Sequence, residues 1–200
     1  MENESTRILA EIIKKRRTRK PAQFTKDPPS KELIKNLINI ARHAPNHHRT
    51  EPARFYLLNS EKIKQVGRLF GETIAKDGQN PILIDKSKRK TREWGEAPGL
   101  IIVTCNTDSS SELVRKNPEV INEDYATCSC ICQNLLLLLE SESIASKWST
   151  GPVWEHPDFD KTVGIKNPSE RVVGLIFYGY SKQEVAPREL RKIENHLTEY

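Results

Sequence analysis

The chain has few aromatic residues and no long apolar run. Phe, Trp and Tyr make up 6% of its 200 residues. A membrane-spanning helix needs about 18 apolar residues in succession, and no stretch of this sequence provides them. The first ten residues are polar and lack the apolar region of a secretory signal. We therefore expect no membrane partner and a cytoplasmic location.

Cysteine is also scarce, and its spacing does not favour a metal site. The four cysteines are Cys105, Cys128, Cys130 and Cys132, and no Cys-x-x-Cys pair is present. A spacing of two residues on a helix directs side chains to different faces, so the last three do not converge easily on one ion. The sequence predicts small buried thiols in a reducing compartment and no bound metal.

Basic residues outnumber acidic residues by a small margin. The 32 Lys and Arg residues against 27 Asp and Glu residues give a net charge of +5 and an isoelectric point near 9.0. This balance suits an anionic partner. An RNA-binding module is the weaker alternative, because few aromatic residues stand among the basic ones and no reader motif is present. We expect no nucleic-acid partner. A charged run over residues 76–96 predicts a solvated helix face or a mobile lid.

Apolar periodicity predicts an α+β fold in a single domain over residues 1–200. Helical spacing predicts a first helix over 5–15 and a second that Ser30 caps and that ends before Pro45. A long helix is expected over 120–143. Short apolar runs predict three strands, over residues 54–58, 100–105 and 171–178.

The long helix contains five consecutive leucines, at residues 135–139. Such a segment is apolar on every side, so it must be buried on every side. A chain of 200 residues has little room to surround a helix completely. We therefore expect burial against a second copy of the chain, in a homodimer.

Two polar clusters are the candidates for chemistry. Residues 14–20 hold six basic side chains in seven positions. Guanidinium groups donate paired hydrogen bonds to phosphate oxygens, which favours a compact phosphate site over a solvated helix end. The second cluster, residues 43–48, has three histidines. Metal binding and an exposed loop are its alternatives, and Ala44-Pro45 breaks any helix that would join His43 to His47.

The order of these clusters resembles the nitroreductase family of FMN enzymes over residues 8–194. The first helix ends in a motif similar to Arg-x-Ser/Thr-x-Lys/Arg, residues 44–55 are similar to the family's Ala-Pro and Gln-Pro-Trp-x-Phe segment, and residues 133–135 match its Gln-Asn-Leu helix. Two segments depart from the pattern. Residues 51–53 read Glu-Pro-Ala, and residues 143–145 replace a Gly-Leu-Gly turn that bears on access of a nicotinamide cofactor.

The resemblance implies which residues bind FMN. The end of the first helix would hold the phosphate and the ribityl chain, with a lysine at the pyrimidine edge that stabilises the reduced flavin. The histidine cluster and the Trp segment would contact the flavin, and a closing arginine, Arg191 or less favourably Arg188, would return to the phosphate. For Trp148 the alternative is a core position. The implied residues are Arg16, Arg17, Thr18, Lys20, His43, His47, Trp148, Ser149, Thr150 and Arg191.

The same resemblance implies a fold and a reaction. The fold is a dimeric three-layer sandwich with a mainly antiparallel central sheet flanked by helices and FMN at the subunit interface. NADH or NADPH reduces the flavin and leaves, and a small nitroaromatic, quinone or enone acceptor then takes the electrons in a ping-pong reaction. The flavin supplies the chemistry, so we assign no catalytic residue. An FMN protein that cleaves or stores flavin is the alternative.

Overall fold

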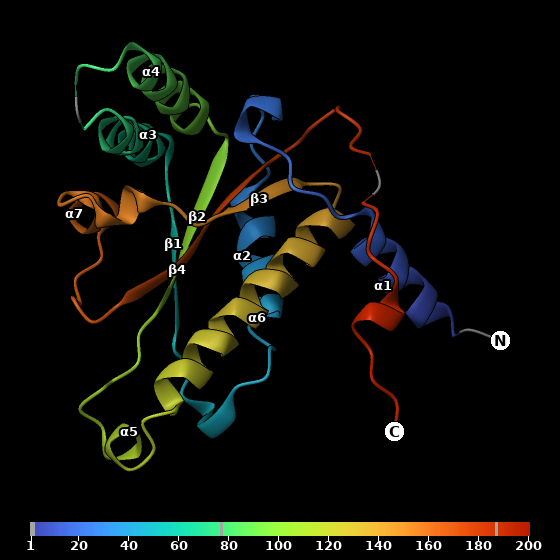
Figure 1. Ribbon diagram of the computed structural model, residues 1–200. Helices are drawn as coiled ribbons and strands as arrows, with labels where there is room; N and C mark the ends of the chain where they lie inside the picture. Colours follow the sequence, from blue (N-terminus) through green and yellow to red (C-terminus); the bar gives the residue numbers. More distant parts are fainter. Residues whose placement is uncertain (1–2, 77, 187) are drawn as a thin grey trace.

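The computed structural model describes residues 3–76, 78–186 and 188–200 (Figure 1). Asp77 of the charged run and Pro187 of the C-terminal motif lie outside the described residues. The elements are, in order, α1 (Glu4–Lys15), η1 (Pro21–Gln23), α2 (Lys31–Ala41), η2 (His47–Arg49), β1 (Ala53–Leu57), α3 (Ser60–Ile74), α4 (Pro81–Gly95), β2 (Gly99–Cys105), α5 (Glu112–Lys116), α6 (Val120–Ser141), β3 (Ala145–Ser149), η3 (Pro152–Glu155), α7 (Phe159–Val163), β4 (Arg171–Gly179) and η4 (Ile193–Asn195).

Four strands form one antiparallel sheet in the order β1-β2-β4-β3. β2 and β4 occupy the centre, and both read as nearly continuous apolar runs because each of their faces is covered. The register shifts between Val103 and Thr104, and the resulting irregularity turns Val173 and Ile176 of β4 toward the same core. β1 and β3 are the edge strands.

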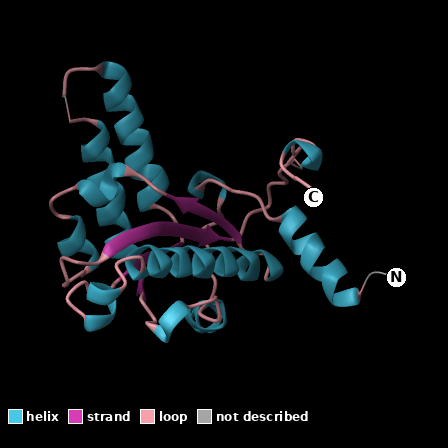
Figure 2. Ribbon diagram, turned by 60° about the horizontal axis from the view of Figure 1, so that its bottom comes forward, coloured by secondary structure: helices cyan, strands magenta, loops and turns pink. Residues whose placement is uncertain are grey.

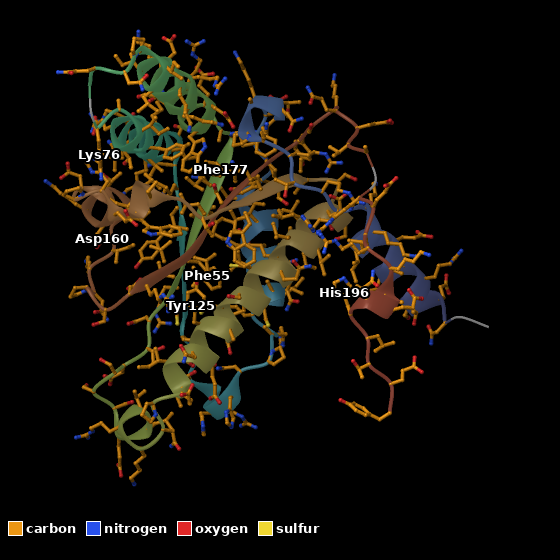
Figure 3. All side chains as sticks on the ribbon, in the orientation of Figure 1. Phe55, Lys76, Tyr125, Asp160, Phe177 and His196 are labelled. Carbon is orange, nitrogen blue, oxygen red and sulfur yellow. The ribbon has the colours of Figure 1, made fainter. Side chains whose placement is uncertain are left out.

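Helices cover both faces of the sheet, which gives three layers (Figures 1 and 2). On one face α2 and α6 pack against Ile101 and Val103 of β2. On the other face, side chains of α3, α4 and α7 pack against Leu100 and Ile102 of β2 and against Phe177 of β4, which is labelled in Figure 3. Alternate residues of one strand therefore belong to different cores. The predicted α+β sandwich with an antiparallel sheet is confirmed.

Local sequence signals place the first two helices. Asn3 caps α1 by accepting a hydrogen bond from the backbone N–H of Ser5. Ser30 caps α2 in the same way through the N–H of Leu33, at 3.2 Å. α2 ends at Ala41, before Pro45, as predicted. Over the described residues, no helix combines the length and apolar character that crossing a bilayer requires.

The leucine run of α6 is buried by its own chain to a greater extent than its composition predicted. Leu135, Leu136 and Leu139 are buried within their own chain, between the sheet and α2. Leu137 and Leu138 remain half-buried. The expectation that one chain cannot bury such a helix was therefore wrong for three of the five leucines, because the sheet and α2 together cover most of its circumference. Two leucines are left for a further contact.

Several elements differ from the prediction. β3 was expected to be a turn followed by a Trp-containing segment, and it is instead an edge strand paired along β4. The strand predicted over residues 171–178 extends one residue further, to Gly179. α3 was not predicted, and it forms an antiparallel pair with α4 (Figure 1). Most of the charged run forms α4, with Lys86 and Arg89 exposed. Of the two interpretations, a solvated helix face and a mobile lid, the structure agrees with the first.

α1 and the C-terminal segment stand beside each other at one end of the molecule, away from the layers (Figures 1 and 2), and His196 marks this segment in Figure 3. No residue of α1 is buried, and Ile8, Leu9 and Ile13 are each about half exposed. The C-terminal segment exposes a second set of large apolar side chains, Leu190, Ile193 and Leu197.

Three of the four cysteines are buried, as predicted, and Cys130 is exposed, contrary to the prediction. Cys130 lies on the outer surface of α6, and neighbours at a spacing of two point elsewhere. Burial raises the pKa of the Cys132 thiol to about 12. That thiol is therefore protonated and unreactive at neutral pH.

Candidate functional site

The chain that leaves α1 runs alongside β3. Thr18 forms a parallel bridge with Ser146, and the backbone N–H of Arg19 donates to the carbonyl oxygen of Ser146 at 3.0 Å. The basic motif of residues 16–20 thus extends the sheet past its edge strand. The basic motif and the segment that contains Trp148, 128 residues apart at Thr18 and Ser146, meet at this edge.

An ion pair buried inside the chain holds this contact in place. The Nη1 atom of Arg19 lies 3.3 Å from Oε2 of Glu140, with 14% and 5% of the two side chains exposed. Glu140 belongs to the last turn of α6. Sequence reasoning did not single out either residue, because the partners are 121 positions apart and neither has a local signature. Arg19 therefore positions the motif, while its neighbours remain available to a ligand.

Unsatisfied polar atoms gather around the same edge. Among the described residues, the buried side-chain nitrogen and oxygen atoms without a hydrogen-bond partner belong to Arg17, Arg19, Glu93, Trp94 and Ser146. Arg17 and Arg19 are in the motif, Ser146 is in β3, and the other two are in the last turn of α4. Buried polar groups in proteins are nearly always paired, so unpaired atoms gathered at one place indicate that a ligand or another chain supplies their partners.

Charged side chains from three elements surround these atoms. Lys147 of β3 places its Nζ 5.7 Å from the centroid of the Trp94 ring. Burial lowers the pKa of the Lys147 ammonium, while the carboxylate of Glu93 acts in the opposite direction. Lys90 and Lys20 are its other charged neighbours. Besides the Arg19–Glu140 pair, the edge therefore presents several cations and the carboxylate of Glu93 at the border of the protein interior.

The histidine cluster lies at the other end of α6. Nδ1 of His47 is hydrogen-bonded to Oε2 of Glu123 at 2.8 Å, in the first turn of that helix. Glu123 and Glu140 are 17 residues apart, which corresponds to about 25 Å along a helix that rises 1.5 Å per residue. His43 is exposed nearby, at the border of a cavity of about 840 Å³ beside α2 and β1. A single chain therefore keeps the histidine cluster far from the basic motif.

The segment that carries the histidines has an unusual backbone. His48, Arg49 and Glu51 have φ angles of 60°, 53° and 45°, in the left-handed region. Ligand atoms of His47, His48 and Glu123 lie within 4.8 Å of one another, a spacing that could hold a metal ion. Both imidazoles are exposed, and the His47–Glu123 hydrogen bond explains their proximity without an ion.

A family model describes most of this chain. The model of the nitroreductase family matches residues 13–180. The chain belongs to the nitroreductase family. The family assignment agrees with the resemblance that the motifs carry, and it includes both the basic motif and the Trp-containing strand.

Individual relatives agree with the family. A protein of Bacillus subtilis named "Putative NAD(P)H nitroreductase YfhC" is 26% identical over 192 residues, which are 96% of this chain and 94% of that protein. A crystal structure of a nitroreductase-like protein from Bacillus cereus has a TM-score of 0.78 at 24% identity, over 96% and 95% of the two chains. A nitroreductase with bound FMN from Bacteroides fragilis has a TM-score of 0.72 at 19% identity over both full chains. The fold is therefore that of nitroreductases.

The remaining residues that the family resemblance implied differ in how far they are buried. Trp148 packs at the edge of the core on the α6 face, and its indole N–H donates to the carbonyl oxygen of Val173 at 3.3 Å. Ser149 is buried and Thr150 is exposed at the end of β3. Arg191 is exposed in the C-terminal segment, and this segment lies beside α1 (Figure 1).

The turn that departs from the family pattern keeps the conformation of a glycine turn. Ser143 has a φ angle of 57°, and its N–H donates to the carbonyl of Glu140 at 3.0 Å. The N–H of Ile144 donates to the carbonyl of Leu139 at 2.8 Å. These two bonds form the Schellman motif that usually has glycine at this position. The altered sequence therefore still turns the chain sharply from α6 into β3.

Proposed function

We propose that this protein is an FMN-dependent oxidoreductase that takes electrons from NADH or NADPH and passes them to small nitroaromatic, quinone or enone acceptors. The observation that carries the proposal is the group of unsatisfied buried atoms at the edge of β3, next to the basic motif. The B. fragilis nitroreductase has FMN bound in the same fold. The B. subtilis relative has a name that includes NAD(P)H.

The residues at this edge fit the chemistry of FMN. Arg16 and Arg17 are half-buried, and the Nε atom of Arg17 has no acceptor among the described residues, so it is free to donate to a phosphate oxygen. Thr18 is exposed and offers its hydroxyl to the phosphate or the ribityl chain. Lys20 would place a positive charge beside the pyrimidine ring. Ser149 and Thr150 would contact the flavin from β3, with Trp148 supporting that strand from behind.

When bound, FMN would supply the two-electron redox chemistry of a ping-pong reaction, in which the nicotinamide donor leaves before the acceptor binds. The protein residues orient the ring and supply positive charge. Lys20 and Lys147 favour electron uptake, because cations stabilise the negative charge that the reduced ring acquires. No side chain is needed as a nucleophile or a general acid in this scheme.

A homodimer accounts for both clusters in one site. Arg19 and His47 bind opposite ends of α6, at Glu140 and Glu123, which are about 25 Å apart, so His43 and His47 would reach the flavin of the partner chain. The exposed apolar side chains of α1 and of the C-terminal segment give a second chain a surface to cover. In the same assembly Arg191 would close over the phosphate. The half-buried Leu137 and Leu138 would complete the contact.

Anaerobic reduction of the FMN-loaded protein tests the proposal. NADH or NADPH should bleach the flavin absorbance, and a quinone or nitroaromatic compound should restore it. Arg16→Ala should weaken FMN binding by about 1–3 kcal/mol, the contribution of a charge-assisted contact. Arg7→Ala, which removes an exposed basic residue from α1, the helix that Arg16 follows, is the matched control. A flavin that stays oxidised with excess NADH and NADPH, yet is reduced by dithionite, would favour a flavin-storing or flavin-cleaving protein.

A further inference from the structure

The last turn of α4 contains a carboxylate that the protein only half satisfies. Oε2 of Glu93 accepts a hydrogen bond from Nζ of Lys90 at 2.5 Å. Its second oxygen, Oε1, is buried and has no partner among the described residues. The side chain is 8% exposed. An ionised carboxylate accepts hydrogen bonds at both oxygens, so a buried bare oxygen is costly unless a donor reaches it.

The surroundings of Glu93 point to a ligand as the source of that donor. Lys147 of β3 lies above the Trp94 ring and is a charged neighbour of Glu93, Lys90 and Lys20. α4 also contacts η1, the short helix that follows Lys20. One carboxylate acceptor is thus set among ammonium donors from α4, β3 and the basic motif. Such a site recognises a group with a donor flanked by acceptors.

The pyrimidine edge of an isoalloxazine ring has that pattern, with an N–H at position 3 between the carbonyl oxygens at positions 2 and 4. We propose that Oε1 of Glu93 accepts the N3–H of FMN, and that Lys90 and Lys147 serve the flanking carbonyl oxygens. The inference rests on the proposed function, since it assumes that FMN occupies this edge. It assigns to Glu93 a role in selecting the cofactor, distinct from its pairing with Lys90.

A flavin without the N3 hydrogen tests this contact directly. FMN and 3-methyl-FMN would each be titrated into the wild-type protein and into Glu93→Leu, which has no acceptor but a similar volume. We expect the wild-type protein to bind 3-methyl-FMN about 10- to 100-fold more weakly than FMN, the effect of a lost charge-assisted hydrogen bond. In Glu93→Leu the two flavins should bind within about threefold of each other, because no acceptor remains to distinguish them.

Two further variants separate contact from structure. Glu93→Gln has a carbonyl oxygen and should keep part of the discrimination. Glu96→Leu, which changes an exposed carboxylate just beyond α4, should keep all of it. Equal affinities of the wild-type protein for the two flavins would overturn the Glu93 contact without the need for any variant. A ratio of FMN to 3-methyl-FMN affinity that is the same in Glu93→Leu as in the wild-type protein would also overturn the contact. Neither result would contradict FMN binding itself. A wild-type protein that binds neither flavin would overturn the proposed function together with this inference.

Discussion

The ion pair between Arg19 and Glu140 joins the candidate site to the core, so its removal should lower the free energy of unfolding. Glu140→Leu would leave the guanidinium of Arg19 buried without its carboxylate. Breaking one side of a buried pair costs roughly 3–5 kcal/mol. We expect a value near the lower end, about 3 kcal/mol, because a single bond of 3.3 Å joins the two side chains and Arg19 is still 14% exposed.

Replacing both partners should recover much of that loss. The double variant Arg19→Met, Glu140→Leu has no uncompensated charge, and apolar side chains of similar size often replace a buried pair at little cost. Urea denaturation of the two single variants and the double variant gives the coupling free energy, which we expect to be about 1–3 kcal/mol. Lys116→Met, which breaks the exposed Lys116–Glu112 pair, is the control and should cost less than about 1 kcal/mol. Single variants that each lose under about 1 kcal/mol, with additive effects, would refute a structural role for the buried pair.

Three further changes test other parts of the structure. Ser143→Gly should stabilise the protein by about 1 kcal/mol in thermal or urea unfolding, because glycine adopts the left-handed conformation without strain, whereas Ser141→Gly, at the last residue of α6, should destabilise it slightly. Gly67→Ala should destabilise by about 3 kcal/mol, because the new methyl group would lie 2.5 Å from a backbone nitrogen of α4; Gly71→Ala meets a threonine hydroxyl that can rotate and should cost less. Leu137→Asp should abolish dimer formation in sedimentation experiments, and a wild-type protein that sediments as a monomer at micromolar concentration would contradict the interface.

The sequence predicted the elements whose signals are local. Ser30 provides a cap before an amphipathic helix, and residues 100–105 form an apolar run too short for a buried helix. β3 was not predicted, since Ser146 and Lys147 interrupt its apolar residues and its strand conformation depends on pairing with β4. The α3–α4 pair likewise depends on a close contact, at Gly67, that spacing alone does not reveal.

The candidate site likewise contains residues that local sequence signals predicted and residues whose position depends on tertiary contacts. The basic motif at residues 16–20 was visible because six of seven successive side chains are basic in that region of the chain. Arg19 was grouped with its neighbours, although the structure pairs it with α6 and so separates it from the residues free to bind a ligand. Glu93 lies inside a charged run that reads as solvated surface. Its burial follows from the packing of Trp94 between α3 and the sheet, which involves residues distant in sequence.

In the proposed homodimer, the length of α6 would link FMN binding to assembly. The helix fixes the basic motif at its last turn and the histidine cluster at its first, and both attachments are side-chain contacts within one chain. A flavin that needs both clusters can then be enclosed only by two chains, each contributing a different end of α6. Because a ligand stabilises the state that binds it, FMN should strengthen the dimer by the same free energy by which dimerisation strengthens FMN binding. The proposed dimer would also cover the exposed apolar side chains of α1, which precedes the basic motif in the chain.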